Sequence, residues 1–165
     1  MTLRFGNDNI KLDGLERLTK AIGDKNPPHV RLGVLGQKST RTAGGEATNA
    51  DIGATHEYGS PAKNIPQRSF LRLPAANVLP GKLESSHAFG DKALKEVVAA
   101  KSIKPWMEKI GKLGEEVVKE AFATEGWGTW KKWSKSYARR KKKGTDNMIL
   151  DDTGQLRDSI TSDVV

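Results

Sequence analysis

The sequence predicts an α+β fold in which a small, mainly antiparallel sheet is flanked by two or three helices. Residues 29–35 alternate between apolar and other side chains, as a strand with one buried face requires. Apolar residues between 91 and 122 instead recur at helical spacing, and the tail 156–165 partly alternates again. Strands early and late in a chain, with helices between them, are typical of α+β proteins. With 165 residues, the chain is expected to form one domain, residues 1–165.

The first part of the chain predicts a short helix and then a strand. Asp13 can cap a helix that ends before Gly23, and the apolar stripe of this helix is Leu15, Leu18 and Ile22. The Asn26-Pro27-Pro28 sequence breaks the chain before the strand at 29–35.

Residues 36–50 have no apolar side chain larger than alanine and are expected to form a long mobile loop. Such a loop cannot offset an ordering cost of about 1–2 kcal/mol per residue, so we expect it to be disordered in the monomer. Asn49 is expected to cap a short helix from Ile52 to His56, which Gly59-Ser60-Pro61 ends.

The middle of the chain predicts a second strand and two helices. Residues 65–73 are interpreted as an extended segment, and Pro66 suits the start of a strand or a sheet edge. Helical spacing covers 91–103 and 106–122, and Pro105 either starts the second helix or kinks one long helix. The Gly126-Trp127-Gly128 sequence ends the helical region.

The positive charge of the chain is local. Residues 131–143 contain eight Lys or Arg and no acid, so the other residues hold 20 basic side chains (28 − 8) against 20 acidic ones. A basic segment at 130–144 on a neutral body predicts contact with nucleic acid, an acidic protein ring or a membrane surface. If residues 133–143 are helical, Trp130, Trp133 and Tyr137 share one face, where they either dock the segment onto the domain or leave it free to bind.

Catalysis is not expected. The chain has no cysteine, and His56-Glu57 is not a zincin motif because Ser60 stands where the second histidine belongs. Asp151, Asp152 and Asp158 could bind Mg²⁺, but a turn for the first two and a polar strand face for the third explain them better. We expect no metal or cofactor, although a small hydrolase with a spatially assembled triad stays open. No 18-residue apolar window and no signal peptide are present, so a protein made in the cytoplasm without a membrane partner is expected.

Two pairs of segments resemble a known family when taken in order. The first pair is Ile52-Gly-Ala-Thr-His-Glu-Tyr-Gly-Ser60 and Ile65-Pro-Gln-Arg-Ser-Phe-Leu-Arg72. The second is Trp133-Ser134 and, after the basic run, Leu150-Asp-Asp-Thr-Gly-Gln-Leu-Arg-Asp-Ser-Ile160. Together they resemble the virion-morphogenesis and tail-completion proteins of tailed bacteriophages over residues 30–162. The family often enters the basic segment with Pro-Leu-Ser/Thr, where this chain has Lys132-Trp133-Ser134, and many relatives continue into a further hairpin beyond Val165.

The resemblance implies a structural role. The expected product is a homo-oligomeric ring, a hexamer in the family, at the head–tail junction or the head-proximal tail end of a virion built in a bacterial cytoplasm. Its partners would be other copies of the chain, neighbouring neck or connector proteins, tail-terminator or tail-tube proteins, and the packaged DNA. Hydrophobic residues make up 36% of the chain and 17 residues are glycine, which suits a subunit that orders on assembly. The alternative is a non-virion nucleic-acid-binding module that uses the basic segment.

The candidate site residues follow from these motifs. Gly59 is expected to cap a helix, Arg68 and Arg72 to need carboxylate or phosphate partners, and the Thr153-Gly154 turn to point Leu156 and Ile160 inward. The residues expected to define the fold or a subunit interface are Glu57, Tyr58, Gly59, Pro66, Arg68, Phe70, Asp152, Thr153, Gly154, Leu156, Ser159 and Ile160. Those expected to contact DNA or an acidic partner are Lys131, Lys132, Lys135, Arg139, Arg140, Lys141, Lys142 and Lys143.

Overall fold

The structure is a computed structural model that describes residues 2–5, 8–11, 16, 19–20, 23–40, 47–88, 90–100, 102–140, 149–150 and 153–165. It confirms an α+β fold with antiparallel strand pairing. The elements are β1 (Thr2–Phe5), β2 (Asp8–Lys11), β3 (Val30–Val34), the 3-10 helix η1 (Gly36–Ser39), α2 (Asn49–Tyr58), the 3-10 helix η2 (Pro61–Lys63), α3 (Arg72–Asn77), α4 (Leu79–Ser85), α5 (Asp91–Ala100), α6 (Lys104–Ala123), α7 (Lys135–Arg140), α8 (Gln155–Asp158) and β4 (Ile160–Val164).

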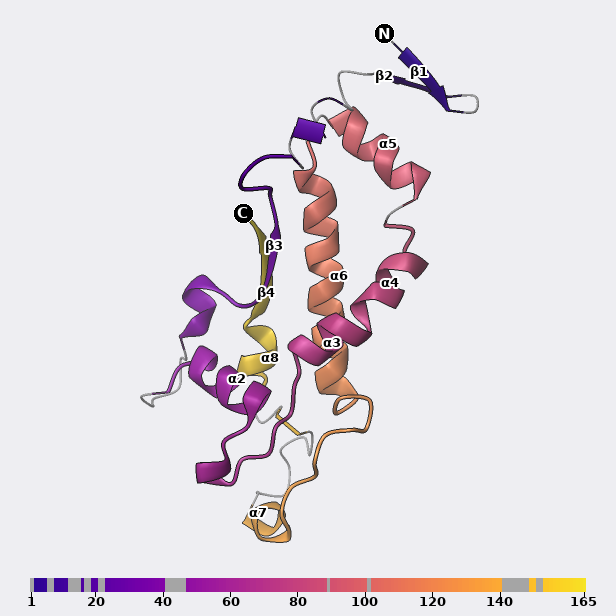
Figure 1. The fold of residues 1–165 in the computed structure, drawn as a ribbon. Helices are drawn as coiled ribbons and strands as arrows, with labels where there is room; N and C mark the ends of the chain where they lie inside the picture. The colour runs from indigo at the N-terminus through magenta and orange to yellow at the C-terminus, as the bar shows by residue number, and fades with distance from the viewer. Residues whose placement is uncertain are drawn as a thin grey trace.

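The long helix α6 forms the axis of an elongated molecule (Figure 1). The β3–β4 pair lies along one side of α6, and α3 and α4 cross its other side. The hairpin β1–β2 is a separate two-stranded sheet beyond α5, at one end, while α7 lies at the opposite end. Among the described residues, no helix is long and apolar enough to cross a membrane.

Helix α6 follows directly from its sequence. Pro105 lies in its first turn, where a missing N–H costs nothing, so Pro105 starts this helix and does not kink a longer one. Of the predicted apolar positions, Met107, Val117, Val118 and Phe122 are buried, whereas Ile110 and Leu113 are half-buried. Val118 and Phe122 belong to one core cluster, whose other members are Phe70, Ala121, Trp130, Ile149, Leu156 and Ile160. The predicted helix at 91–103 is also present, as α5.

The predicted first and last strands pair with each other. β3 and β4 are antiparallel, with Val30 opposite Val164 and Val34 opposite Ile160. Two glycines let α6 approach this sheet: a Cβ at Gly111 would lie 2.6 Å from Ser162 Oγ, and one at Gly114 would lie 2.9 Å from Leu32 Cδ2. The glycines therefore fix the spacing between helix and sheet.

Glu115 joins the same two elements by hydrogen bonds. Its carboxylate accepts hydrogen bonds from the backbone N–H of Ser162 at 2.8 Å and from the Ser162 hydroxyl at 2.7 Å. Lys112 Nζ also donates to Glu115 Oε1 at 3.0 Å. Burial raises the pKa of Glu115, but the hydrogen bonds from Ser162 and Lys112 outweigh it and hold that pKa below its usual value.

The extended segment predicted at 65–73 is not a strand. Ile65 forms only an isolated bridge with Ser60, and α3 begins at Arg72. Arg68, Ser69 and Phe70 are buried in succession, so the alternation expected of a half-buried strand is absent. The sequence did not predict α3 and α4, because Pro74 and Pro80 within them argue against helix.

Three further boundaries differ from the prediction. Thr48, not Asn49, caps α2 through a capping box with Asp51, while the Asn49 side chain donates to the carbonyls of Lys38 and Thr40. Gly36–Ser39 forms a short 3-10 helix inside the predicted loop, of which 41–46 lie outside the described residues. Residues 155–158 form α8, where the final strand was expected to begin.

The predicted helix capped by Asp13 falls largely outside the described residues. Of its span, Glu16, Thr19 and Lys20 are helical, and the N–H of Gly23 donates to the carbonyl of Thr19 at 2.9 Å.

Adding a methyl group at the helix–sheet contact should destabilise the protein. Gly111→Ala places a Cβ against Ser162, and the overpacking should lower the free energy of unfolding by about 1–3 kcal/mol. Gly81→Ala in α4 is the matched control, because a Cβ there meets no atom within 4 Å and removes only glycine's helix penalty of about 1 kcal/mol. Urea unfolding followed by circular dichroism measures the free energy of unfolding of both variants. If the two substitutions stabilised the protein equally, the close contact between α6 and the sheet at Gly111 would be contradicted.

Stability should depend on pH through Glu115. A carboxyl whose folded pKa is depressed contributes stability that is complete above its unfolded pKa, about 4.3, and is lost as the pH falls through the folded pKa. Glu115→Gln should therefore be less stable than the wild type at pH 7, and the difference should shrink below about pH 4. Thermal melts from pH 3 to pH 7 test this, with Glu116→Gln at an exposed position of the same helix as control. A pH-independent difference would contradict it.

Candidate functional site

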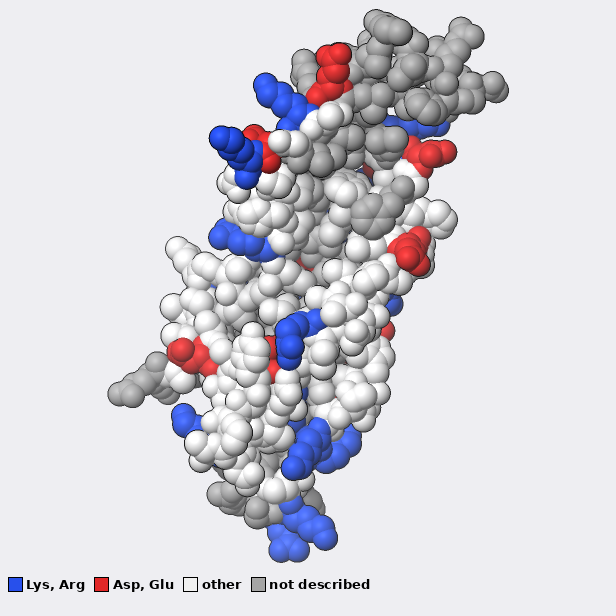
Figure 2. All heavy atoms as spheres, in the orientation of Figure 1, with Lys and Arg blue, Asp and Glu red and all other residues white. Residues whose placement is uncertain are grey.

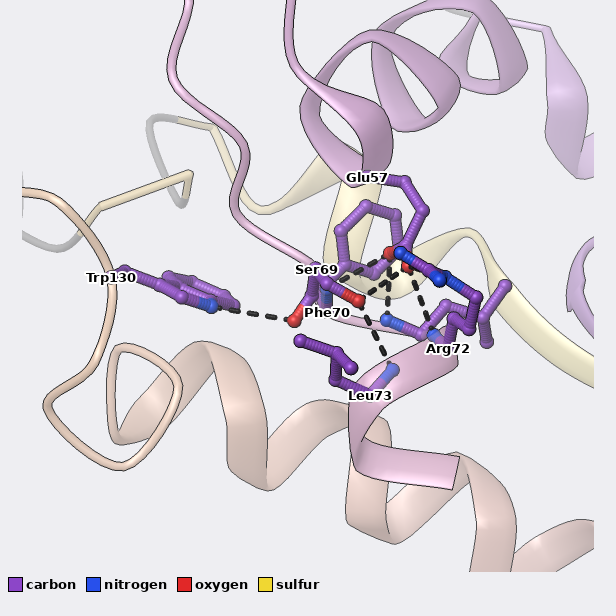
Figure 3. Close-up of polar contacts among 7 residues, drawn as sticks. Glu57, Ser69, Phe70, Arg72, Leu73 and Trp130 are labelled. Carbon is purple, nitrogen blue, oxygen red and sulfur yellow. Dashed lines mark hydrogen bonds and ion pairs between the residues drawn. The ribbon is translucent and has the colours of Figure 1, made fainter. Parts of the chain in front are cut away.

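The first sequence motif folds around one buried carboxylate. Glu57, in the last turn of α2, is 4% exposed and accepts a hydrogen bond from the Ser69 hydroxyl. It also accepts from three successive backbone N–H groups, those of Phe70 at 3.0 Å, Leu71 at 3.0 Å and Arg72 at 3.1 Å (Figure 3). We call Glu57 with residues 69–72 the Glu57 cluster.

Leu71 is the N-cap residue of α3 and Arg72 its first residue, while Phe70 directly precedes them. The first turn of a helix leaves its N–H groups unpaired and carries a partial positive charge, which a carboxylate stabilises. The residue preceding α3, Leu71, provides no side-chain cap, and Ser69 Oγ accepts from Leu73 N–H at 3.1 Å. Glu57 therefore caps α3 from another helix.

Gly59 allows the chain to return to Glu57. Its φ of 75° is a left-handed value, and a Cβ there would lie 2.8 Å from the backbone nitrogen of Gln67. The following segment, which includes the half-buried Pro66, runs back beside α2. The N–H of Arg68 donates to the carbonyl of His56 at 2.8 Å. The predicted glycine cap is thus a turn that brings residues 65–72 against the end of α2.

Arg72 and Tyr58 lie at the solvent side of the Glu57 cluster. Arg72 Nε is 3.8 Å from Glu57 Oε1, and its guanidinium lies 5.7 Å from the centre of the Tyr58 ring. Tyr58 is 67% exposed and Leu73 is 47% exposed, so these residues form a small exposed surface next to the cluster. We call Tyr58, Arg72 and Leu73 the Tyr58 surface.

Arg68 has a different role from the one its motif predicted. It is 6% exposed, and its Nε and Nη2 donate to the backbone carbonyl of Lys131 at 3.0 Å and 2.8 Å. In the part of the chain that the structure describes, no carboxylate lies within 4.0 Å of it, contrary to the expectation of a carboxylate or phosphate partner. Burial lowers the pKa of Arg68, but a guanidinium keeps its charge in proteins. Arg68 anchors the start of the basic segment.

The C-terminal motif completes the same core. Gly154 has a φ of 72° and leads the exposed Thr153 into α8, after which Leu156 and Ile160 are buried, as predicted. A Cβ at Gly53 of α2 would lie 3.4 Å from both Leu156 and Phe70, so the motif segments meet at this point. The Ser159 hydroxyl is buried and donates to the carbonyl of Leu156 at 2.6 Å. Asp152 lies outside the described residues.

The described part of the basic segment, residues 130–140, contains α7 and extends to one end of the molecule, where Lys and Arg side chains gather (Figure 2). Lys131, Lys132, Lys135 and Arg139 are exposed. Lys132 forms an ion pair with Glu125, which also accepts from the N–H of Ile149. The side chain of Arg140 and all of Lys141, Lys142 and Lys143 lie outside the described residues.

The aromatic residues of this segment do not share one helical face. Trp130 precedes the helix, is 6% exposed and packs edge-on against Phe122 with ring centres 5.9 Å apart. Its Nε1 donates to the carbonyl of Ser69 at 3.4 Å. Trp133 packs on the core and contacts Tyr137, which is 46% exposed. The two tryptophans therefore dock the segment, while the described cations Lys131, Lys132, Lys135 and Arg139 are exposed.

Other candidate groups do not form a reactive site within the described residues. No group of three or more His, Asp or Glu there could hold a metal ion. Asp158 is exposed in α8 beside Arg157, not on a strand face, and Asp151 is outside the described residues. Burial and the nearby charge of Arg68 both lower the pKa of His56, which keeps its ring neutral at pH 7.

Sequence reasoning did not select Ser69 as a member of the site, and it placed Trp130 only on an aromatic face of the basic segment, not beside Ser69. Ser69, three residues before α3, matches the ordinary preference of serine near a helix start, a signal hidden by the strand interpretation of 65–73. Trp130 gave no such signal, because its place in the core depends on contacts with Phe122 and Ser69, far away in the sequence.

Removing the Glu57 carboxylate should unfold the joint between α2 and α3. Glu57→Ala leaves a buried hydroxyl and three backbone donors unpaired, and should lower the free energy of unfolding by about 3–5 kcal/mol. Tyr58→Ala, one residue on and exposed, should cost about 1 kcal/mol or less. Urea unfolding curves measure both, and similar losses in the two variants would refute the capping role.

Comparison of the chain with protein-family models, with curated proteins and with solved structures finds no match in any of the three.

Proposed function

We propose that this chain is a structural subunit of a tailed-phage virion that forms a ring at the head–tail junction or the head-proximal end of the tail, and completes neck or tail assembly there. The observation that carries the proposal is the meeting of the two motif pairs behind the family resemblance. Glu57 and Phe70 come from the first pair and Leu156 and Ile160 from the second, and they enclose one core. Motif residues that define a common fold would behave in this way.

The same geometry suits a subunit with no catalytic role. The Glu57 cluster is a rigid joint, and the exposed Tyr58 surface beside it offers an aromatic ring, a guanidinium and an aliphatic side chain to a neighbour. Aromatic residues and arginine are enriched at protein interfaces. In this proposal the whole chain, residues 1–165, is one domain, its ring is a hexamer, and its neighbours are connector proteins and tail-terminator or tail-tube proteins.

The basic segment would face the packaged DNA or an acidic neighbouring ring. Lysine contacts with phosphate are strong but carry no sequence information, which suits a genome that must slide past. Lys131, Lys135 and Arg139 are exposed while Trp130 and Arg68 hold the segment to the core. Because the basic segment is anchored to the core, its exposed charges would form a positive surface in a fixed position.

Composition of purified virions tests the proposal. Mass spectrometry should find the chain in stoichiometric amounts in particles, and native mass spectrometry should find assemblies of the purified chain at high concentration. Deleting its gene should leave filled heads and tails unjoined or malformed. Normal infectious particles from the deletion, with no copies of the chain in wild-type particles, would instead favour the non-virion nucleic-acid-binding alternative.

Neutralising the basic segment should lower particle yield without unfolding the protein. The test variant replaces Arg139, Arg140, Lys141, Lys142 and Lys143 by glutamine. The matched control removes five exposed positive charges elsewhere, at Lys25, Lys38, Lys63, Lys92 and Lys119. If the basic segment contacts DNA, the affinity of the wild type for duplex DNA should fall as salt is added. A plot of the logarithm of the binding constant against the logarithm of the salt concentration should then have a slope of about −0.9 per phosphate contact. Equal particle yields from test and control variants would reduce the strip to an ordinary solvated surface.

A further inference from the structure

The backbone of the β3–β4 sheet has one edge that is sealed and one that is open. His29 and Val165 exchange both of their backbone hydrogen bonds, at 2.8 Å and 3.0 Å. Hydrogen-bonded and non-hydrogen-bonded pairs alternate along an antiparallel ladder. The register therefore makes Arg31–Asp163 and Gly33–Thr161 the bonded pairs, and the backbone groups of Val30, Leu32 and Val34 point away from β4.

The outer edge of β4 is closed by α6. Ser162, opposite Leu32, points its N–H outward, and the Glu115 carboxylate accepts it at 2.8 Å. A carboxylate on a strand edge blocks another strand from pairing there. The Glu115 carboxylate therefore disfavours strand addition at this edge of β4.

The outer edge of β3 has no such cover in the part of the chain that the structure describes. There, β3 pairs only with β4, and no side chain bonds the outward backbone groups of Val30, Leu32 or Val34. A strand edge with unpaired N–H and C=O groups is a template for another strand.

The β1–β2 hairpin is a candidate to pair with the β3 edge, because it forms a sheet of two short strands. It is a two-stranded sheet of four-residue strands, separate from β3–β4 and located beyond α5 at the end of the molecule (Figure 1). An isolated two-stranded hairpin is at best marginally stable in water, and additional paired strands with a hydrophobic face increase its stability. In the described ranges of the chain, β2 lies next to α5 and β1 pairs with β2 alone, so the outer edge of β1 is the one taken as available.

We propose that β1 of one copy of this chain adds to the β3 edge of a second copy, giving a four-stranded intermolecular sheet in the order β2, β1, β3, β4. The contact joins two different surfaces, so it is head-to-tail and repeats from copy to copy until a ring closes. It supplies the subunit contact of the proposed virion ring and rests on that proposal only for its biological setting. The interface is the open β3 edge, and the partner is the N-terminal hairpin of an identical chain.

Single cysteines can test the pairing cleanly, because the chain contains none. The variants are Arg4→Cys in β1 and Arg31→Cys in β3, where Arg31 is exposed and holds only a surface ion pair with Asp163. One variant is labelled with ¹⁵N, the two are mixed, and a short bis-maleimide is added. A linker of about 10 Å tolerates an offset of two or three residues, since a strand rises about 3.3 Å per residue.

Mixed dimers joined through positions 4 and 31 should dominate the cross-linked products, and the R4C/R31C double variant should give a ladder of oligomers. R4C mixed with E108C, an exposed site on α6, should give few cross-links. Dominant R31C homodimers would overturn the proposal in favour of twofold β3–β3 pairing. A link within one chain of the double variant would mean that the hairpin folds back on its own β3, and would also overturn it.

Blocking the β3 edge provides a second readout that does not depend on cross-linking. Val30→Pro removes an N–H that points away from β4, so the ladder to β4 stays intact, and Val30→Thr is the control that keeps it. Native mass spectrometry should show at least about tenfold weaker association for V30P, and for deletion of residues 1–11, than for V30T. Unchanged assembly in both would overturn strand addition while leaving the proposed ring standing; a virion that lacks the chain would remove the ring itself.

Discussion

A buried carboxylate is tolerated only where hydrogen-bond donors replace the water it has lost, and Glu57 finds those donors on the main chain of residues 70–72. This one requirement positions much of the surrounding fold. It ends the segment after Gly59, starts α3 at Arg72 and holds Phe70 over Phe122, with ring centres 5.1 Å apart. The carbonyl of Ser69, fixed by the same arrangement, then receives Trp130, and Arg68 one residue earlier holds the carbonyl of Lys131. The basic segment is therefore anchored through the Glu57 cluster.

A second carboxylate organises the other half of the molecule. Glu115 reaches from α6 to the edge of β4, and the neighbouring Gly111 and Gly114 permit the close approach that this bond needs. The side chain that joins helix to sheet also seals one edge of the sheet. Among the described residues, the outer edge of β4 is blocked at Ser162 and that of β3 is not, and this asymmetry is a consequence of how α6 packs.

Glu57 and Glu115 hold the elements of the fold together, while other parts of the molecule stay exposed to solvent. The core around Phe122 is buried and each anchored joint holds its carboxylate by hydrogen bonds, whereas the Tyr58 surface, the exposed cations near α7 and the edge of β3 face outward. These three surfaces lie on different parts of the chain.

Local patterns in the sequence were enough to predict what short-range physics controls. The apolar spacing of α6, Pro105 in its first turn, the strands β3 and β4, and the turns at Gly59 and Gly154 all follow from periodicity or backbone preference. The α+β class follows from the order of these elements. The motif residues Glu57, Phe70, Leu156 and Ile160 could be selected from the sequence, although their mutual contacts could not.

The tertiary structure alone decided the elements that depend on a distant partner. Residues 65–73 have the composition of a strand, but the carboxylate of Glu57 offers their backbone N–H groups a buried acceptor, and a helix starts there in its place. Arg68 bonds a carbonyl 63 residues away, and Trp130 enters the core instead of the face of α7. Sequence spacing describes neighbours along one element, whereas a buried charge is satisfied by whichever donors the fold brings to it.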